Sequence, residues 1–256
     1  MEKGNGRWGI SHGAGLIAVA VALAIAVPLS AWIAVNGIKD VKQARDTIVV
    51  TGSARYPISA DLGTWSLRAS ATGETPEAAI KALRGKVKQI HAFFTEGGLS
   101  PDSITSPPIQ VAQVSVRVPT GVPKPAFKRV QLWRVSQNFQ IQTTDIDTLV
   151  RVASQVGDLL AGGTDVSVSP ISYLSTKLVA AKFAALRLAV ADAQKRASTI
   201  AEGLGARLGP LQGTRLGVYQ ITPRNSNEVS GGGTNDTSSR LKDVEAVVNV
   251  TFNIQH

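Results

Sequence analysis

Residues 181–205 read AKFAALRLAVADAQKRASTIAEGLG, and this stretch holds the most distinctive local pattern of the chain. Small side chains recur at every fourth position, at Ala181, Ala185, Ala189, Ala193, Ala197 and Ala201. Four residues of an α-helix turn through about 400°, so these alanines form one ridge that drifts by about 40° per step. A ridge of small side chains lets another helix or a sheet approach the backbone closely. We therefore predict a long helix, beginning near Ser175, with one closely packed face.

Two interpretations of the alanine ridge are open. In the one that we favour, the ridge packs on a sheet of the same chain. In the other, part of it lies in a contact between subunits. Further apolar residues broaden the surface, namely Leu186, Leu188, Val190 and Ile200. Asp192 stands four residues before Arg196, which is the favourable order for an ion pair along a helix.

Upstream of this helix, the pattern predicts a strand followed by an amphipathic helix. Apolar and polar residues alternate over residues 65–72, which is typical of a half-buried strand. Thr75, Pro76 and Glu77 then combine an N-cap, a fixed φ and an acid at the positive end of the helix dipole. Apolar residues recur at helical spacing until Gly97 and Gly98, so we predict a helix between these signals.

The remaining segments complete an α+β pattern. We predict strands over residues 47–51, 112–118, 133–141, 211–221 and 244–254, and a strand over 165–173 that Pro170 interrupts. We also predict a helix over 145–160, a Pro-rich hairpin tip over 119–125 and a mobile loop over 225–239. Such alternation favours antiparallel or mixed sheets that helices cover on one side. The rhythm of residues 129–221 further predicts a split βαβ sandwich.

An uncharged segment near the N-terminus predicts a membrane anchor. Residues 14–35 contain no charge over 22 positions, and a helix of that length spans about 33 Å, enough for a hydrocarbon core. Its apolar side chains are Leu16, Ile17, Val19, Val21, Leu23, Ile25, Val27, Leu29, Trp32 and Ile33. A cleaved signal peptide with a soluble periplasmic product is the alternative, but no good small-x-small cleavage site follows. We therefore expect a tail (1–13), an inner-membrane anchor, a linker (36–46) and an exported domain (47–256).

The composition leaves little material for enzyme chemistry. The chain has no cysteine and three histidines, so thiol nucleophiles and multi-histidine metal sites have almost nothing to be built from. His91 is expected at the boundary of the core, and Asp145 and Asp147 are best explained as helix-start residues. The glycines at 231–233 lack the Lys-Ser/Thr ending of a phosphate loop, and Ser239-x-x-Lys242 has no partner motif. We predict no catalytic residue, metal or cofactor.

The net charge of +9 has three readings. Nucleic-acid binding is disfavoured because aromatic residues make up 5% of the chain. An anionic lipid or another envelope polymer is a possible partner for a basic helix face, formed by Lys81, Arg84, Lys86 and Lys88. Solubility and ion pairing between subunits is the third reading.

Several local motifs together resemble the SIMPL-domain family of bacterial periplasmic and oxidative-stress defence-like proteins. They are Val50-Thr51-Gly52, Thr75-Pro76-Glu77-Ala78-Ala79, Gly98-Leu99, Trp133-Arg134-Val135-Ser136, Asp145-Ile146-Asp147-Thr148-Leu149, and the alanines at 189, 193, 197 and 201 running into Gly203-Leu204-Gly205. The likeness covers residues 47–256, which we divide into halves 47–128 and 129–256. It implies an exported α+β domain, ring-shaped homo-oligomers with a channel-like centre, and no catalytic residues to carry over.

Taken together, these features predict an anchored, non-enzymatic protein that self-assembles into a structural part of the cell envelope, with a link to stress tolerance. A monomeric or dimeric module that binds an anionic ligand, lipid or partner protein on the basic helix face is the alternative. An enzyme is a third, weaker hypothesis.

Overall fold

The computed structural model describes residues 47–120 and 126–255, and the predicted tail, anchor and linker lie outside them. In chain order the elements are β1 (Thr47–Ser59), β2 (Leu62–Gly73), α2 (Pro76–Glu96), a 3₁₀ turn (Pro101–Ser103), β3 (Ile104–Thr105), β4 (Gln110–Thr120), β5 (Ala126–Thr143), α3 (Ile146–Ser154), α4 (Val156–Ala161), β6 (Val166–Val168), β7 (Ser172–Leu174), α5 (Leu178–Gly203), β8 (Arg207–Leu216), β9 (Gln220–Pro223), β10 (Thr234–Asn235) and β11 (Leu241–Gln255). The α+β class predicted from the sequence is confirmed.

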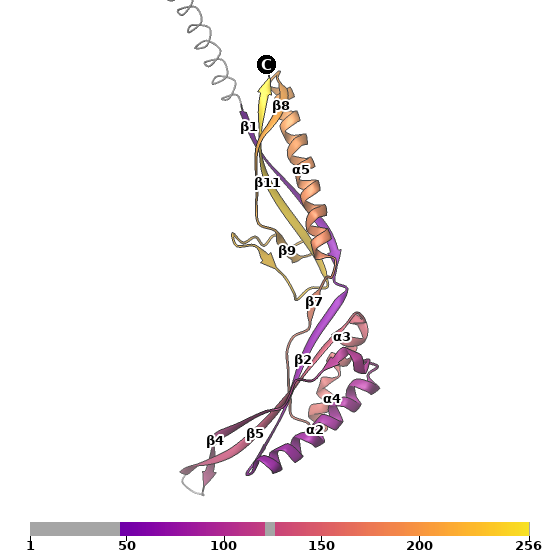
Figure 1. Ribbon diagram of the computed structural model, residues 1–256, viewed down its shortest axis with the longest axis vertical. Coiled ribbons are helices and arrows are strands. Elements are labelled where there is room, and N and C mark those ends of the chain that lie inside the picture. Colours follow the sequence, from indigo (N-terminus) through magenta and orange to yellow (C-terminus); the bar gives the residue numbers. More distant parts are fainter. Residues whose placement is uncertain (1–46, 121–125, 256) are drawn as a thin grey trace, which may run out of the picture. The chain divides into compact units, whose positions relative to one another are not determined.

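An antiparallel six-stranded sheet is built around β2 and β5. These two strands pair from Gly63↔Thr143 to Gly73↔Trp133, and the other edge of β2 pairs with β6 and β7. β5 also pairs with β3 and, over its N-terminal part, with β4, from Gln110↔Ser136 to Thr120↔Ala126. The predicted hairpin of residues 112–141 is therefore confirmed, and β4 with β5 forms a long two-stranded ribbon (Figure 1).

The main hydrophobic core lies between this sheet and α2. Trp65, Leu67, Ala69 and Ala71 are buried, as the alternation predicts, and Val135, Phe139 and Ile141 share their face because they are the cross-strand partners. Phe94 of α2 lies at the centre, with its ring centroid 6.1 Å from that of Trp65 and 6.0 Å from that of Phe139, both edge-to-face. Such aromatic pairs add to the stabilisation from apolar burial.

The predicted start and end signals of α2 are also confirmed. The Thr75 hydroxyl accepts a hydrogen bond from the Ala78 N–H at 3.3 Å, and Pro76 opens the helix. Gly98 has a φ of +87°, and the Leu99 N–H donates to the Phe94 carbonyl at 3.0 Å. A residue with positive φ after the last turn is the usual glycine stop of a helix.

A mixed five-stranded sheet has the order β1-β11-β9-β10, with β8 also paired to β11. One face of β11 buries Val244, Ala246, Val248 and Val250, in agreement with the predicted alternation. The intervening residues of β11 carry polar pairs to β1, since Thr51 contacts Asn249 at 2.6 Å and Arg55 contacts Glu245 at 3.1 Å.

Three predictions of detail are wrong. Residues 129–221 do not form one split βαβ sandwich, because β5, β6 and β7 belong to the six-stranded sheet whereas β8 and β9 belong to the five-stranded one. The helix predicted over 145–160 is interrupted at Gln155, where α3 ends and α4 begins. Residues 211–221 end one strand and begin another, whereas the predicted interruption at Pro170 is confirmed, because it separates β6 from β7. Alternation specifies which side chains share a face, but not which strand is the partner.

The described residues divide into two compact units. One contains residues 47–52, 192–215 and 249–255, and the other contains residues 53–120, 126–191 and 216–248. The predicted boundary after residue 128 falls within β5. Between residues 47 and 255, the described helices are all too short or too polar to cross a membrane.

Candidate functional site

The alanine ridge of α5 is covered within the chain. All six of its alanines are between 0 and 3% exposed. Residues 192–203 of α5 run beside β8 and the adjoining ends of β1 and β11, as Figure 1 shows. The predicted ion pair is confirmed, with Arg196 Nε 2.8 Å from Asp192 Oδ2.

The opposite face of α5 is apolar and open. Val179 is 67% exposed and Phe183 is 62% exposed, and Val190 is exposed as well. At 100° per residue these three positions lie within about 40° of one another, on the side away from Ala181 and Ala185. We call Val179, Phe183 and Val190 the outer face of α5. A helix that is apolar on both sides is typical of one that is covered on both sides.

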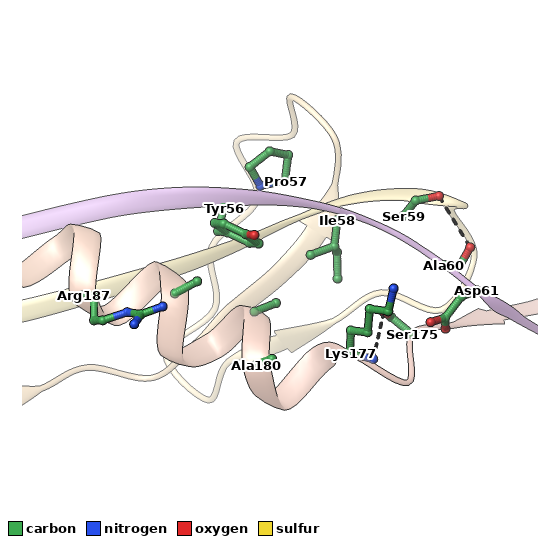
Figure 2. A pocket seen from close by; sticks show the side chains of 12 residues that line it. Tyr56, Pro57, Ile58, Ser59, Ala60, Asp61, Ser175, Lys177, Ala180 and Arg187 are labelled. Carbon is green, nitrogen blue, oxygen red and sulfur yellow. Dashed lines mark hydrogen bonds between the residues drawn. The ribbon is translucent and has the colours of Figure 1, made fainter.

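A cavity of about 600 Å³ lies between the end of β1 and the start of α5. Figure 2 shows Arg187 and Lys177 on the helix side, with Tyr56 and Ile58 on the strand side. Residues 56–61 line the cavity consecutively rather than alternately, so it follows the edge of β1 and not only one of its faces. β1 pairs only with β11 within the described residues, which leaves that edge open.

Asp61 fixes the chain at the start of α5. Its carboxylate accepts hydrogen bonds from the Thr176 N–H and hydroxyl, both at 2.7 Å. These bonds hold the pKa of Asp61 below its usual value, and the nearby Lys177 contributes in the same direction. Asp61 therefore stays ionised and hydrogen-bonded to Thr176. Lys177 and Arg187, which also line the cavity, give it a cationic character.

A second cavity, of about 270 Å³, contains a buried ion pair in its lining. Lys242 is 2% exposed, and its Nζ donates to the backbone oxygen of Asp236 at 2.5 Å and to its carboxylate at 3.1 Å. Although burial raises the pKa of Asp236, hydrogen bonds from Ser238 and the ammonium of Lys242 lower it to about 2. The Asp236 carboxylate is thus charged at any physiological pH.

The predicted loop of residues 225–239 is held by this same carboxylate. Asp236 accepts hydrogen bonds from the Ser238 N–H at 2.9 Å and the Ser239 N–H at 3.2 Å, and its own N–H donates to Ile221. The side chain of Gln220 also donates to the Ser230 carbonyl at 2.7 Å. The loop therefore has defined hydrogen bonds to β9 and β11, and its mobility stays a prediction.

The basic face predicted on α2 is divided by the structure. Lys81, Arg84 and Lys88 are exposed, whereas Lys86 Nζ donates to the Ser70 carbonyl at 2.7 Å. A cavity of about 420 Å³ adjoins this face and is lined by Ile80, Leu83, Arg84, Val87, Lys88, Ile109 and Gln137. Three of the four cations thus remain available to an anionic partner.

The residues considered as candidates for catalysis or metal binding do not gather into one site. His91 is exposed, and its ring lies edge-to-face to that of the buried Phe139 at 5.5 Å, so it borders the core. The Lys242 ammonium bonds Asp236 rather than Ser239. Asp145 caps α3 through the Thr148 N–H at 3.0 Å, and Asp147 pairs with Arg240 at 2.5 Å. In the described part of the chain, no three His, Asp or Glu side chains gather where they could hold a metal ion.

Sequence reasoning missed the Asp236–Lys242 pair, although one signal was present. Lys242 has the same parity as Val244 and Ala246 on β11, so the alternation places it on the buried face. A lysine at such a position requires an acidic partner. The partner lies six residues away in a loop, which periodicity cannot reveal.

Comparison with known protein families gives one match. The family model described as "SIMPL: Protein of unknown function (DUF541)" matches residues 48–252. That range closely follows the segment over which the motifs resemble the family, so the resemblance is confirmed. Among curated proteins, no match to the chain is found.

Proposed function

The chain belongs to the SIMPL family, a family of unknown function, and on this premise we propose that it is a membrane-anchored, exported protein that self-assembles into a structural part of the cell envelope. The anchor is the uncharged segment of residues 14–35. The proposed assembly is a closed homo-oligomer, in which many anchors would act together and convert weak envelope contacts into strong ones. A role in stress tolerance belongs to the same proposal.

The outer face of α5 is the observation that carries the proposal. The alanine ridge is already covered by the chain itself, so it leaves no surface for a partner. The outer face instead offers large apolar side chains in one row, and such patches on soluble surfaces mark interaction sites. A second copy of the chain is the partner that we propose for this face, because it is present wherever the protein itself is present.

The mass of the assembled full chain tests this proposal. We expect the protein, purified in mild detergent, to be larger than a dimer by light scattering with the detergent mass subtracted. Substitution of Phe183→Ser together with Val190→Ser should reduce it to a monomer or dimer, because two apolar contacts are lost. Leu160→Ser on α4 is the matched control, since it removes an exposed apolar side chain from another helix. A monomeric wild type at tens of micromolar, or an unchanged double variant with native circular dichroism, contradicts the proposal.

The alternative function rests on α2. Its three exposed cations and the adjoining cavity support a binding module for an anionic ligand or lipid. Reversal of Lys81, Arg84 and Lys88 to Glu in the full chain, held in neutral-lipid nanodiscs, should then abolish retention on anionic vesicles. Reversal of Lys195, Arg207 and Arg215, which are also exposed, is the charge-matched control. Equal retention of both triple variants rules out this face.

A further inference from the structure

The β4–β5 ribbon is unusually basic. From residue 103 to residue 144 the chain contains no Asp or Glu over 42 positions, whereas it contains five Lys or Arg residues. Four of them lie on β4 and β5, namely Arg117, Lys128, Arg129 and Arg134. The charge of this ribbon is therefore uncompensated along its own sequence.

Two of these cations face each other across the ribbon. Arg117 is the cross-strand partner of Arg129 in the antiparallel register. Like charges at directly opposite positions destabilise a strand pair, because their side chains lie close together on one face. Neither guanidinium has a hydrogen-bond or ion-pair partner within the described residues. An anion bound between the two arginines would remove this repulsion, and phosphate oxygens suit paired guanidinium groups.

The end of the ribbon also carries an exposed apolar side chain on each face. Phe127 is 65% exposed and is the cross-strand partner of Pro119, on the same face as the two arginines. Val118 is 40% exposed on the other face, opposite Lys128 and next to the pair Val116↔Val130. Exposed apolar side chains on both faces suit immersion in an apolar phase better than docking of one face on a partner.

We propose that the end of the β4–β5 ribbon inserts into the interface of an anionic phospholipid bilayer. Phe127 and Val118 enter the boundary of the acyl chains, and Arg117 with Arg129 binds the phosphate groups. The pair Arg117↔Arg129 lies two residues from the pair Pro119↔Phe127, which is about 7 Å along a strand. That distance agrees with a burial depth of about 5–10 Å for interfacial segments.

Other polyanions fit the ribbon less well. Binding of single-stranded nucleic acid uses several aromatic side chains on which bases stack. On the described part of the ribbon Phe127 is the one highly exposed aromatic residue, because Trp133 is half-buried next to the core. An acidic protein surface would satisfy the arginines but would leave Val118 on the opposite face uncovered. The lipid interface satisfies both features, and it is independent of the contact proposed for α5.

A single fluorescent label tests the insertion, because the chain contains no cysteine. Phe127→Cys in the full chain provides one site for an environment-sensitive NBD dye. The labelled protein is held in phosphatidylcholine nanodiscs, and vesicles with or without 30% phosphatidylglycerol are added. We expect a blue shift and increased emission with the anionic vesicles alone, and reversal at about 1 M salt, where charges are strongly screened. The same dye at Gln212→Cys on β8 should not respond.

The arginine pair is tested in the same labelled background. Arg117→Ser with Arg129→Ser should weaken the apparent vesicle affinity by about 30-fold, since each basic residue near an anionic surface contributes roughly a factor of five. Arg207→Ser with Arg215→Ser removes equal charge from β8, where both side chains are exposed, and should leave the response unchanged. The arginine variant should unfold at the same or a higher temperature, because repulsion is removed. An undiminished response in the arginine variant, equal loss in both double variants, or a response to oligonucleotide but not to vesicles overturns the proposal.

Discussion

Helices α2 and α5 each pack on one side of a sheet, but their composition is reversed. α2 buries Leu83, Ile90 and Phe94 against β2 and β5 and presents cations to solvent. α5 buries alanines and presents Val179 and Phe183 to solvent. Among the described residues, the largest fully buried side chains come almost entirely from the region of α2, and Val244 alone comes from the five-stranded sheet. The apolar side of α2 is therefore covered within the chain, whereas α5 has one apolar side packed closely and a second one exposed to solvent.

The largest expected effect is a difference in the free energy of unfolding between variants of the buried Phe94 and of the exposed Phe183. Phe94→Ala should lower the free energy of unfolding by about 4 kcal/mol, because it leaves a cavity between Trp65 and Phe139. Phe183→Ala should cost less than about 0.5 kcal/mol within one chain. Any further loss in that variant should depend on protein concentration, since self-association stabilises by mass action. Urea unfolding of both full-chain variants at two protein concentrations measures these changes. Equal losses of unfolding free energy in the two variants would contradict the contrast between the helices.

The second prediction concerns the Asp236–Lys242 ion pair, which we expect to stabilise the five-stranded sheet, where few large side chains are fully buried. Lys242→Met should lower the free energy of unfolding by about 3 kcal/mol, because the Asp236 carboxylate stays buried without its ammonium partner. Lys177→Met, at an exposed lysine, is the control and should change it by less than about 0.5 kcal/mol. Urea denaturation measures both. If Lys242→Met is as mild as the control, the ion pair does not support this sheet.

A third substitution tests the close approach of α5 directly. Ala189→Leu should cost about 2 kcal/mol, because the alanine is fully buried and a larger side chain would push the helix from its sheet. Gly85→Leu on the open side of α2 is the control increase in volume, and a Cβ added there meets no neighbouring atom. It should be neutral or stabilising, since leucine favours a helix more than glycine. Thermal unfolding compares the two, and a harmless Ala189→Leu would show that the ridge is loosely packed.

The smallest effect is a pH dependence. The folded-state pKa of Asp236 is about 2, below the 3.8 of an unperturbed aspartate. The carboxylate therefore contributes about 2 kcal/mol above pH 3.8, and this contribution is lost as the pH falls toward 2. The difference in free energy of unfolding between wild type and Asp236→Asn should accordingly shrink between pH 5 and pH 2. A difference that stays constant over this range would mean that the carboxylate is not stabilised by folding.

The sequence predicted the region of α2 better than the region of α5. Capping by Thr75, the glycine stop at Gly98 and the alternation from Trp65 to Ala71 are local signals, and all were confirmed. The assignment of β8 and β9 to a second sheet depends on long-range pairing, which no local pattern encodes. The bond between Asp236 and Lys242 depends on how a loop returns to β11. Local periodicity therefore gives elements and faces, and tertiary contacts decide partners.

The solvent access of position 183 in the membrane tests the central claim most directly. Phe183→Cys and Leu160→Cys each introduce one thiol into the full chain, and both side chains are exposed within a single chain, by 62% and 52%. Labelling of intact membranes with a water-soluble maleimide should be much slower at position 183 than at position 160, because another copy covers the outer face of α5. After dissociation in dilute detergent the two rates should become similar. Equal, fast labelling of both positions in the membrane would contradict the account.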